Sequence, residues 1–371
     1  MSNIIEAISI PNKFFTLSGH WPGAKTTIFQ RMLFCVDILF NLSLLAEFTN
    51  HFDDYEILSE HLSITISPVS YLIKMIIFKI KSDAVQNLIC SIKLKEFNDC
   101  PNHLRNIIEQ TVKYSKFLGY VYQSLCLVTI LLYSLVPVFT EADLPLRFSY
   151  YIGNFKPVMY AFQVMGLVSA ASNNSSMDIL AMSLMRICAA QIEILNRKII
   201  GLSDEYEKYR PDYIKTELKR CVKHHVKIIR YHEILNEVFS MIILTQYATS
   251  AVVICNLGFQ LVHVDPMTLQ FVRMTVYFIA MMIQLAMYCW FGNEIIVKSS
   301  AIRDACYEFK WFESDLETRK TIITIMERSK QPLVLKVGKF SMLSLQSFTS
   351  VIRTSYSYFT LMQTLYRKNQ N

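Results

Sequence analysis

Two ionisable side chains, Asp37 and Lys74, lie inside long apolar stretches of this 371-residue sequence. A charged side chain at the centre of a bilayer costs about 2.5–3.5 kcal/mol on insertion scales, so such residues are usually paired or functional. Counted from the same membrane face, Asp37 lies about 16 Å into its helix and Lys74 about 10 Å into the next, antiparallel one. We expect the two to form an intramembrane ion pair. In the alternative, Lys74 only extends its aliphatic stem until the amine reaches water.

The best candidates for metal ligands in the sequence are three histidines, His224, His225 and His232. His225 and His232 share one helix face, but zinc needs three or four ligands and the nearest carboxylate, Glu233, points to another face. We therefore expect packed or solvated histidines, with no metal site and no cofactor. The sequence also lacks the H-E-x-x-H and G-x-S-x-G motifs of hydrolases, so it does not indicate an enzyme.

The last apolar segment, 340–366, is unusually polar and carries Arg353 near its middle. Hydroxyl and amide side chains are poorly solvated by lipid, so this helix is expected to line an aqueous path. Close packing of small residues in a helix bundle is the alternative. Ten further polar residues of the segment are Ser344, Gln346, Ser347, Thr349, Ser350, Thr354, Ser355, Ser357, Thr360 and Gln363.

Aromatic residues and methionines gather in the halves of the apolar stretches that face away from the basic loops. Adaptable methionines, aromatic walls and few polar groups are typical of a pocket for a small apolar ligand. Part of the pattern is also explained by an interfacial aromatic belt or by ordinary core packing. The residues expected to bind the ligand are Tyr71, Tyr133, Tyr160, Phe162, Met165, Tyr277 and Met281.

The elements that must position these residues are membrane-spanning helices. Hydrophobic residues make up 52% of the chain and charged residues 18%, whereas soluble domains carry about a quarter charged residues. Stretches of about 18 or more apolar residues are long enough to cross the bilayer. The sequence predicts seven such spans, at 26–47, 62–80, 117–140, 157–177, 238–262, 274–293 and 340–366.

Positive charge alternates between the connecting loops and orients the chain. Every second loop, 79–116, 178–237 and 294–339, is basic, and together these loops hold 27 Lys and Arg residues against 5 on the other side. Basic loops stay in the cytoplasm, so residues 1–25 are predicted to be cytoplasmic and the tail 367–371 extracellular. The net charge of +7 then reflects topology in a lipid bilayer, and no nucleic acid is expected as a partner.

The two long basic loops are helical in pattern. Apolar residues recur at helical spacing through 182–198 and again through 213–235, with a break at Gly201 between them. Helices 4 to 7 are therefore expected to extend into one packed intracellular lobe, formed by parts of 178–237 and by an anchor region at 294–339. The predicted fold is all-α, a polytopic membrane protein with seven transmembrane helices, a cytoplasmic N-terminus and an extracellular C-terminus.

The C-terminal part of the sequence resembles a known family. Residues 355–362, Ser-Tyr-Ser-Tyr-Phe-Thr-Leu-Met, preceded by Gly-Lys-Phe-Ser-Met-Leu-Ser-Leu at 338–345, are similar to the C-terminal signature of insect odorant receptors. The resemblance implies a ligand-gated, non-selective cation channel in the plasma membrane of sensory neuron dendrites. It also implies a heterotetramer in which a tuning subunit such as this chain joins a co-receptor.

The resemblance further implies roles for individual segments. The outer halves of the helices within 26–293 would hold a small volatile ligand, and the helix at 340–366 would line the pore. Leu361 and Leu365 match the family's apolar gate, and Gln363 between them would add polarity there.

Two alternatives remain open. A gustatory-type channel typically ends in Thr-Tyr followed by Gln-Phe, whereas here Gln363 is followed by Thr364. A transporter would also place polar residues at mid-span, although no repeat between the two halves of the chain supports it.

Overall fold

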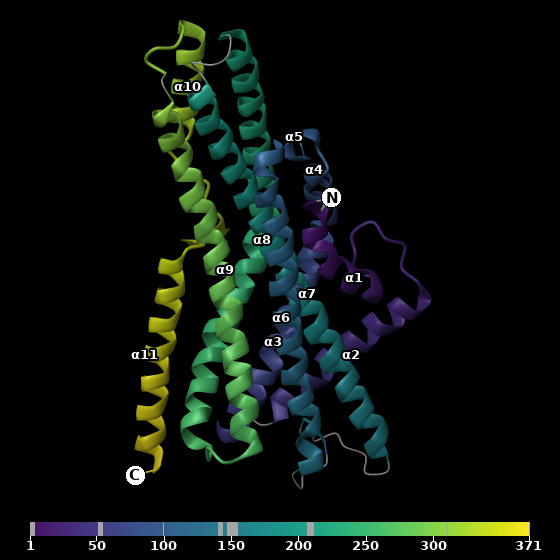
Figure 1. Ribbon diagram of the computed structural model, residues 1–371. Coiled ribbons are helices and arrows are strands. Elements are labelled where there is room, and N and C mark those ends of the chain that lie inside the picture. The colour runs from purple at the N-terminus through teal and green to yellow at the C-terminus, as the bar shows by residue number, and fades with distance from the viewer. Residues whose placement is uncertain are drawn as a thin grey trace.

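The computed structural model describes residues 4–50, 55–98, 100–139, 144–146, 155–205, 211–309 and 311–370. The described chain is almost entirely helical, so the all-α prediction is confirmed (Figure 1). The short N-terminal elements are η1 (Ile4–Ile8) and α1 (Ser9–Ser18). The other helices are α2 (Ile28–Asn50), α3 (Tyr55–Ile80), α4 (Ser82–Ile92), α5 (Lys95–Asn98), η2 (Asn102–Leu104), α6 (Arg105–Phe139), α7 (Lys156–Glu205), α8 (Pro211–His263), α9 (Leu269–Glu308), α10 (Leu316–Arg328) and α11 (Leu345–Gln370).

Seven long helices occupy the seven predicted spans: α2, α3, α6, α7, α8, α9 and α11. Five of these regions in the described residues are apolar and long enough to cross a membrane by composition alone: Ile28–Glu47, His61–Ile80, Asn102–Leu135, Asp212–His263 and Leu269–Glu308. The other two, α7 and α11, are more polar, because α7 carries serines and asparagines at 172–176 and α11 is rich in hydroxyls. In α7 these polar residues are largely buried in the bundle, where other helices surround them.

Three helices are much longer than a bilayer requires. The lengths of α7, α8 and α9 are 50, 53 and 40 residues. At 1.5 Å per residue each helix is at least about 60 Å long, whereas the hydrocarbon core of a bilayer is about 30 Å thick. These helices run on together at the end of the bundle where α10 packs against α8 and α9 (Figure 1). The predicted extension into one lobe is thus confirmed for helices 4 to 6 but not for helix 7, because α11 begins only at Leu345.

The N-terminal segment is part of the bundle. The elements η1 and α1 pack against α6 and α7, and Ile4, Ile8 and Phe15 are buried. The ring of Phe15 lies 5.6 Å from that of Phe78 on α3. Gly19 then ends α1 in the left-handed conformation that glycine adopts without strain, with φ of 77°.

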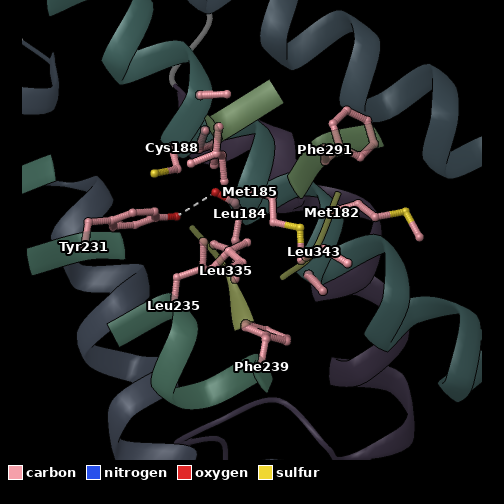
Figure 2. Close-up of a cluster of buried hydrophobic side chains, with 14 of the residues drawn as sticks. Met182, Leu184, Met185, Cys188, Tyr231, Leu235, Phe239, Phe291, Leu335 and Leu343 are labelled. Carbon is pink, nitrogen blue, oxygen red and sulfur yellow. Dashed lines mark hydrogen bonds between the residues drawn. The ribbon is translucent and has the colours of Figure 1, made fainter. Parts of the chain in front are cut away.

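A compact apolar core joins α7, α8 and α9 to the segment that precedes α11 (Figure 2). The Tyr231 hydroxyl of α8 donates a hydrogen bond of 3.2 Å to the carbonyl of Leu184 on α7. Leu335 and Leu343 insert between these helices and are fully buried. The other labelled side chains of the core are Met182, Met185, Cys188, Leu235, Phe239 and Phe291.

The seventh helix begins later than the sequence predicts. Residues 340–344, expected to be helical, belong instead to a hairpin in which β1 (Lys336–Val337) pairs with β2 (Ser341–Met342). Gly338 turns the chain with φ of 60°, and its N–H donates to the carbonyl of Ser240 on α8 over 3.1 Å. The hairpin departs from the helical pattern because burying Leu335 and Leu343 requires the chain to reverse direction.

The close approach of α9 to this hairpin depends on Gly292. A Cβ atom there would lie 2.5 Å from Cγ and 2.7 Å from the carbonyl oxygen of Leu343. We predict that Gly292→Ala lowers the thermal stability of the solubilised protein, by about 1–3 kcal/mol for overpacking. Fluorescence-detected gel filtration after heating measures this. Gly201→Ala on α7 is the control, because a Cβ there meets nothing within 4 Å. Equal melting temperatures for the two variants would contradict the prediction.

Candidate ligand cavity and buried ion pair

A cavity of about 130 Å³ lies between α3, α6, α7 and α9. Ile64 lies in the first half of α3 and Tyr133 near the end of α6, so the cavity lies toward the end of the bundle opposite α10 (Figure 1). Most of the residues around it are apolar or aromatic. The lining residues are Ile64, Ser67, Pro68, Tyr122, Cys126, Thr129, Ile130, Tyr133, Leu167, Ala170, Ala171, Asn174, Tyr277, Ala280, Met281 and Gln284.

Three of the seven residues expected to bind a ligand lie around this cavity: Tyr133, Tyr277 and Met281. The rings of Tyr133 and Tyr277 meet edge to face, with centroids 6.2 Å apart. The Tyr277 hydroxyl also shares a 2.5 Å hydrogen bond with the Ser67 hydroxyl on α3. These contacts fix the aromatic wall, because each tyrosine is held by a neighbour on another helix.

The other four expected residues lie away from the cavity. The Tyr160 hydroxyl donates to the carbonyl of Ser134 over 3.0 Å, and the ring of Phe162 packs 6.1 Å from that of Phe40. Met165 is 50% exposed on the outer face of α7. Tyr71, fully buried, faces α2 instead. Helical spacing identified the aromatic half of the bundle, but the rotation of each helix decides which side chains reach the cavity.

A fully buried ion pair lies at the floor of the cavity. Lys74 on α3 and Asp178 on α7 have no exposed side-chain surface, and Nζ lies 2.9 Å from Oδ1. Nζ also donates to Oδ1 of Asn174 over 2.9 Å and to the amide oxygen of Gln246 on α8. The three protons of the ammonium group are thereby all used, which compensates for the loss of its hydration.

The carboxylate of Asp178 is satisfied from α9. Its Oδ1 accepts a 2.8 Å hydrogen bond from the Tyr288 hydroxyl, and its Oδ2 accepts one from Nε2 of Gln284. Gln246 in turn donates to Oε1 of Gln284 over 2.7 Å and to Ser250 over 2.9 Å. We call Lys74, Asn174, Asp178, Gln246, Gln284 and Tyr288 the floor network. It joins α3, α7, α8 and α9 at one point.

The predicted pairing of Lys74 with Asp37 is corrected by this arrangement. Lys74 pairs with Asp178, and Asp37 on α2 instead accepts a 3.3 Å hydrogen bond from the Tyr71 hydroxyl. The pairing was predicted from the depths of Asp37 and Lys74 in the membrane, but α3 turns the Lys74 side chain toward α7 and α8. The sequence pattern does not single out Asp178, because this residue directly follows the charge-free span 157–177 and begins the basic loop 178–237. Its spacing of four residues from Asn174, on one helix face, was the available signal.

The three residues expected to form a gate lie far along α11 and not at the cavity. The Leu361 side chain is 53% exposed, and Gln363 is half-buried. The side chain of Leu365 lies outside the part of the chain that the structure describes. The histidines of α8 pack in the lobe: Nε2 of His224 lies 2.8 Å from Oε1 of Gln191 on α7.

Comparisons with known proteins agree on one family. The family model described as 7tm Odorant receptor matches residues 55–356. Odorant receptor 13a of Drosophila melanogaster is 33% identical over 189 residues, 47% of this chain and 45% of that protein. Odorant receptor Or2 of Anopheles gambiae is 32% identical over 150 residues, 40% of this chain and 39% of that protein. The alignments thus span less than half the length of these relatives.

The fold is similar to that of a solved receptor. The olfactory receptor OR5 of Machilis hrabei, solved in complex with eugenol, superposes with a TM-score of 0.84. The match covers 96% of this chain and 97% of that one, at 18% sequence identity. The similarity extends to the whole seven-helix arrangement.

The floor network predicts a specific pattern of stability. Lys74→Met leaves the Asp178 carboxylate buried without its counter-ion, and Asp178→Asn does the same to the ammonium group. Each should cost about 3–5 kcal/mol, the usual penalty for breaking a buried pair, and the double variant should regain much of it. Thermal stability and surface expression measure this. The double variant Lys74→Met and Asp37→Asn is the matched control. If stability recovered in this variant instead, the result would support a pair between Lys74 and Asp37.

Proposed function

This chain belongs to the 7tm odorant receptor family, and we propose that it is the ligand-binding subunit of an odorant-gated, non-selective cation channel. The family comprises multi-pass membrane receptors and not enzymes. The observation that carries the proposal is the cavity between α3, α6, α7 and α9, which is apolar on its walls and polar at its floor.

The size of the cavity favours a small volatile ligand. Its volume is about 130 Å³. An engineered apolar cavity of about 150 Å³ in another protein binds benzene, so molecules of one ring or a short chain are the expected range. The receptor of Machilis hrabei with the same fold was solved with eugenol, a small aromatic molecule. We infer that this chain binds compounds of that class in the cavity.

The loop charges support a cytoplasmic N-terminus and an extracellular end of α11. In this orientation the lobe around α10 lies in the cytoplasm and the cavity in the outer half of the membrane. An odorant could then enter from the outside or from the outer leaflet. The plasma membrane of a sensory neuron dendrite is the proposed location, with an odorant receptor co-receptor as the partner in a heterotetramer.

The pore is proposed to be lined by α11. This helix packs against α8 and α9 but exposes Tyr358 and Leu361 on its other side. A second cavity of about 230 Å³ lies between α11 and these two helices, so α11 has room to move against them. Leu361, Gln363 and Leu365 would form the constriction, closed by dewetting when the leucines converge.

The floor network offers a route from the ligand to α11. Gln246 and Tyr288 of the network are followed in sequence by Tyr247 and Cys289, whose hydroxyl and thiol lie 2.7 Å apart. On α11, Ser355 donates to the carbonyl of Ala251 on α8 over 3.2 Å. A ligand shifts the gating equilibrium only as far as it binds one state more tightly. A change at the cavity floor would alter the contacts of α8 and α9, the two helices against which α11 packs.

Co-expression with an insect co-receptor tests the proposed function. Currents to a panel of one-ring and short-chain odorants are recorded in cells where surface labelling confirms expression. We predict that Ala171→Leu, which fills the cavity, lowers the sensitivity at least tenfold, because the ligand loses space. Val168→Leu, on the exposed side of the same helix, is the control and should respond like the wild type. No response of the wild-type receptor to any odorant would contradict the proposal.

The gate is tested without any ligand. The double variant Leu361→Ala and Leu365→Ala is expected to raise the basal current severalfold, because a less apolar constriction holds water more readily. Leu345→Ala, at the first residue of the same helix, is the control for the truncation itself. Unchanged basal current in the double variant, at equal surface expression, would show that these leucines do not form the pore constriction.

A further inference from the structure

The side chain of Asn174 has an uncommitted hydrogen-bond donor at the cavity floor. Its Oδ1 accepts a hydrogen bond from Nζ of Lys74 over 2.9 Å. Within the part of the chain that the structure describes, the Asn174 side chain makes no other hydrogen bond. A lysine ammonium group only donates, so the amide oxygen must face it and the orientation of the amide is fixed. The Nδ2 group, with two protons, is left on the other side, and Asn174 lines the cavity.

Four other polar groups around the cavity are hydrogen-bonded to protein partners. Ser67 and Tyr277 bond each other over 2.5 Å, and the Thr129 hydroxyl donates to the carbonyl of Leu125 over 2.9 Å. Gln284 uses its oxygen for Gln246 and its nitrogen for Asp178. Asn174 therefore differs from these four groups in having both protons of its amide nitrogen to offer a ligand, whereas Gln284 has already used one of its two for Asp178.

We propose that Asn174 is the polar anchor of the cavity, and that the receptor is tuned to small apolar molecules that carry one hydrogen-bond acceptor at one end. Ketones, aldehydes, esters and ethers belong to this class. The inference rests on the proposed function, since it assigns a ligand class to the same cavity. The adjacent ammonium group of Lys74 polarises the amide and strengthens its N–H as a donor. A ligand oxygen bound there would touch the floor network directly.

The expected selectivity follows from the free-energy cost of burying the Asn174 N–H groups without a hydrogen-bond acceptor. A hydrocarbon that fills the cavity covers Nδ2 without accepting its hydrogen bond, whereas a ketone of the same shape accepts it. The hydrogen bond corresponds to about a tenfold difference between ketone and hydrocarbon in the odorant concentration that gives a half-maximal response. Cyclohexanone and methylenecyclohexane form such a pair, because they differ in a carbonyl oxygen against a methylene group.

The experiment compares matched ketones and alkenes of five to eight carbons on receptor co-expressed with the co-receptor. The wild type should respond to the ketones at about tenfold lower concentration. Asn174→Asp keeps an acceptor for Lys74 but removes the donor, so it should lose this preference. Thr129→Val, a polar lining residue already bonded to its own helix, should retain it.

The outcomes separate the two proposals. Equal responses of the wild type to ketone and alkene, or a response to other odorants but to no ketone, would overturn the anchor while leaving the receptor function intact. An unchanged preference in Asn174→Asp would do the same. If that variant does not reach the surface, the wild-type comparison alone decides. Silence toward every odorant, at confirmed surface expression, would instead contradict the proposed function.

Discussion

The burial of one ion pair constrains the whole bundle. Lys74 and Asp178 have no exposed side-chain surface, and taking two charges out of water is costly unless each is fully hydrogen-bonded. Satisfying both requires amides and a hydroxyl from α7, α8 and α9, so these helices must meet α3 at one depth and in one rotation. Apolar packing tolerates small rotations, whereas this network does not. It therefore sets the register in which the remaining contacts form.

The cavity has its polar floor because of the same network. Its walls come from apolar and aromatic side chains of α3, α6, α7 and α9, while Asn174 and Gln284 belong both to the lining and to the network. A ligand in this cavity would thus lie against the groups that fix helix rotation. This proximity gives a physical basis for coupling, since a change in the hydrogen bonds of Asn174 or Gln284 alters the balance at Lys74 and Asp178.

The last helix is attached to the bundle in a different way from the others. It follows a hairpin anchored by Leu335 and Leu343, and it leaves a cavity of about 230 Å³ against α8 and α9. A firmly held start and a cavity along its length are compatible with the proposed role of α11 as a moving pore helix. The proposed gate residues lie in the second half of this helix, away from its anchor.

The sequence by itself determined the helical class, the seven spans and the lobe, because long charge-free runs and helical spacing are local properties that lipid selects residue by residue. It also located the aromatic half in which Tyr133, Tyr277 and Met281 surround a cavity. Only the tertiary structure decided that Lys74 pairs with Asp178 instead of Asp37 and that 340–344 belongs to a hairpin. It also decided that four expected ligand-binding residues lie away from the cavity, namely Tyr71, Tyr160, Phe162 and Met165. These outcomes depend on which face each helix turns toward its neighbours, and that rotation is set by contacts between residues far apart in the chain.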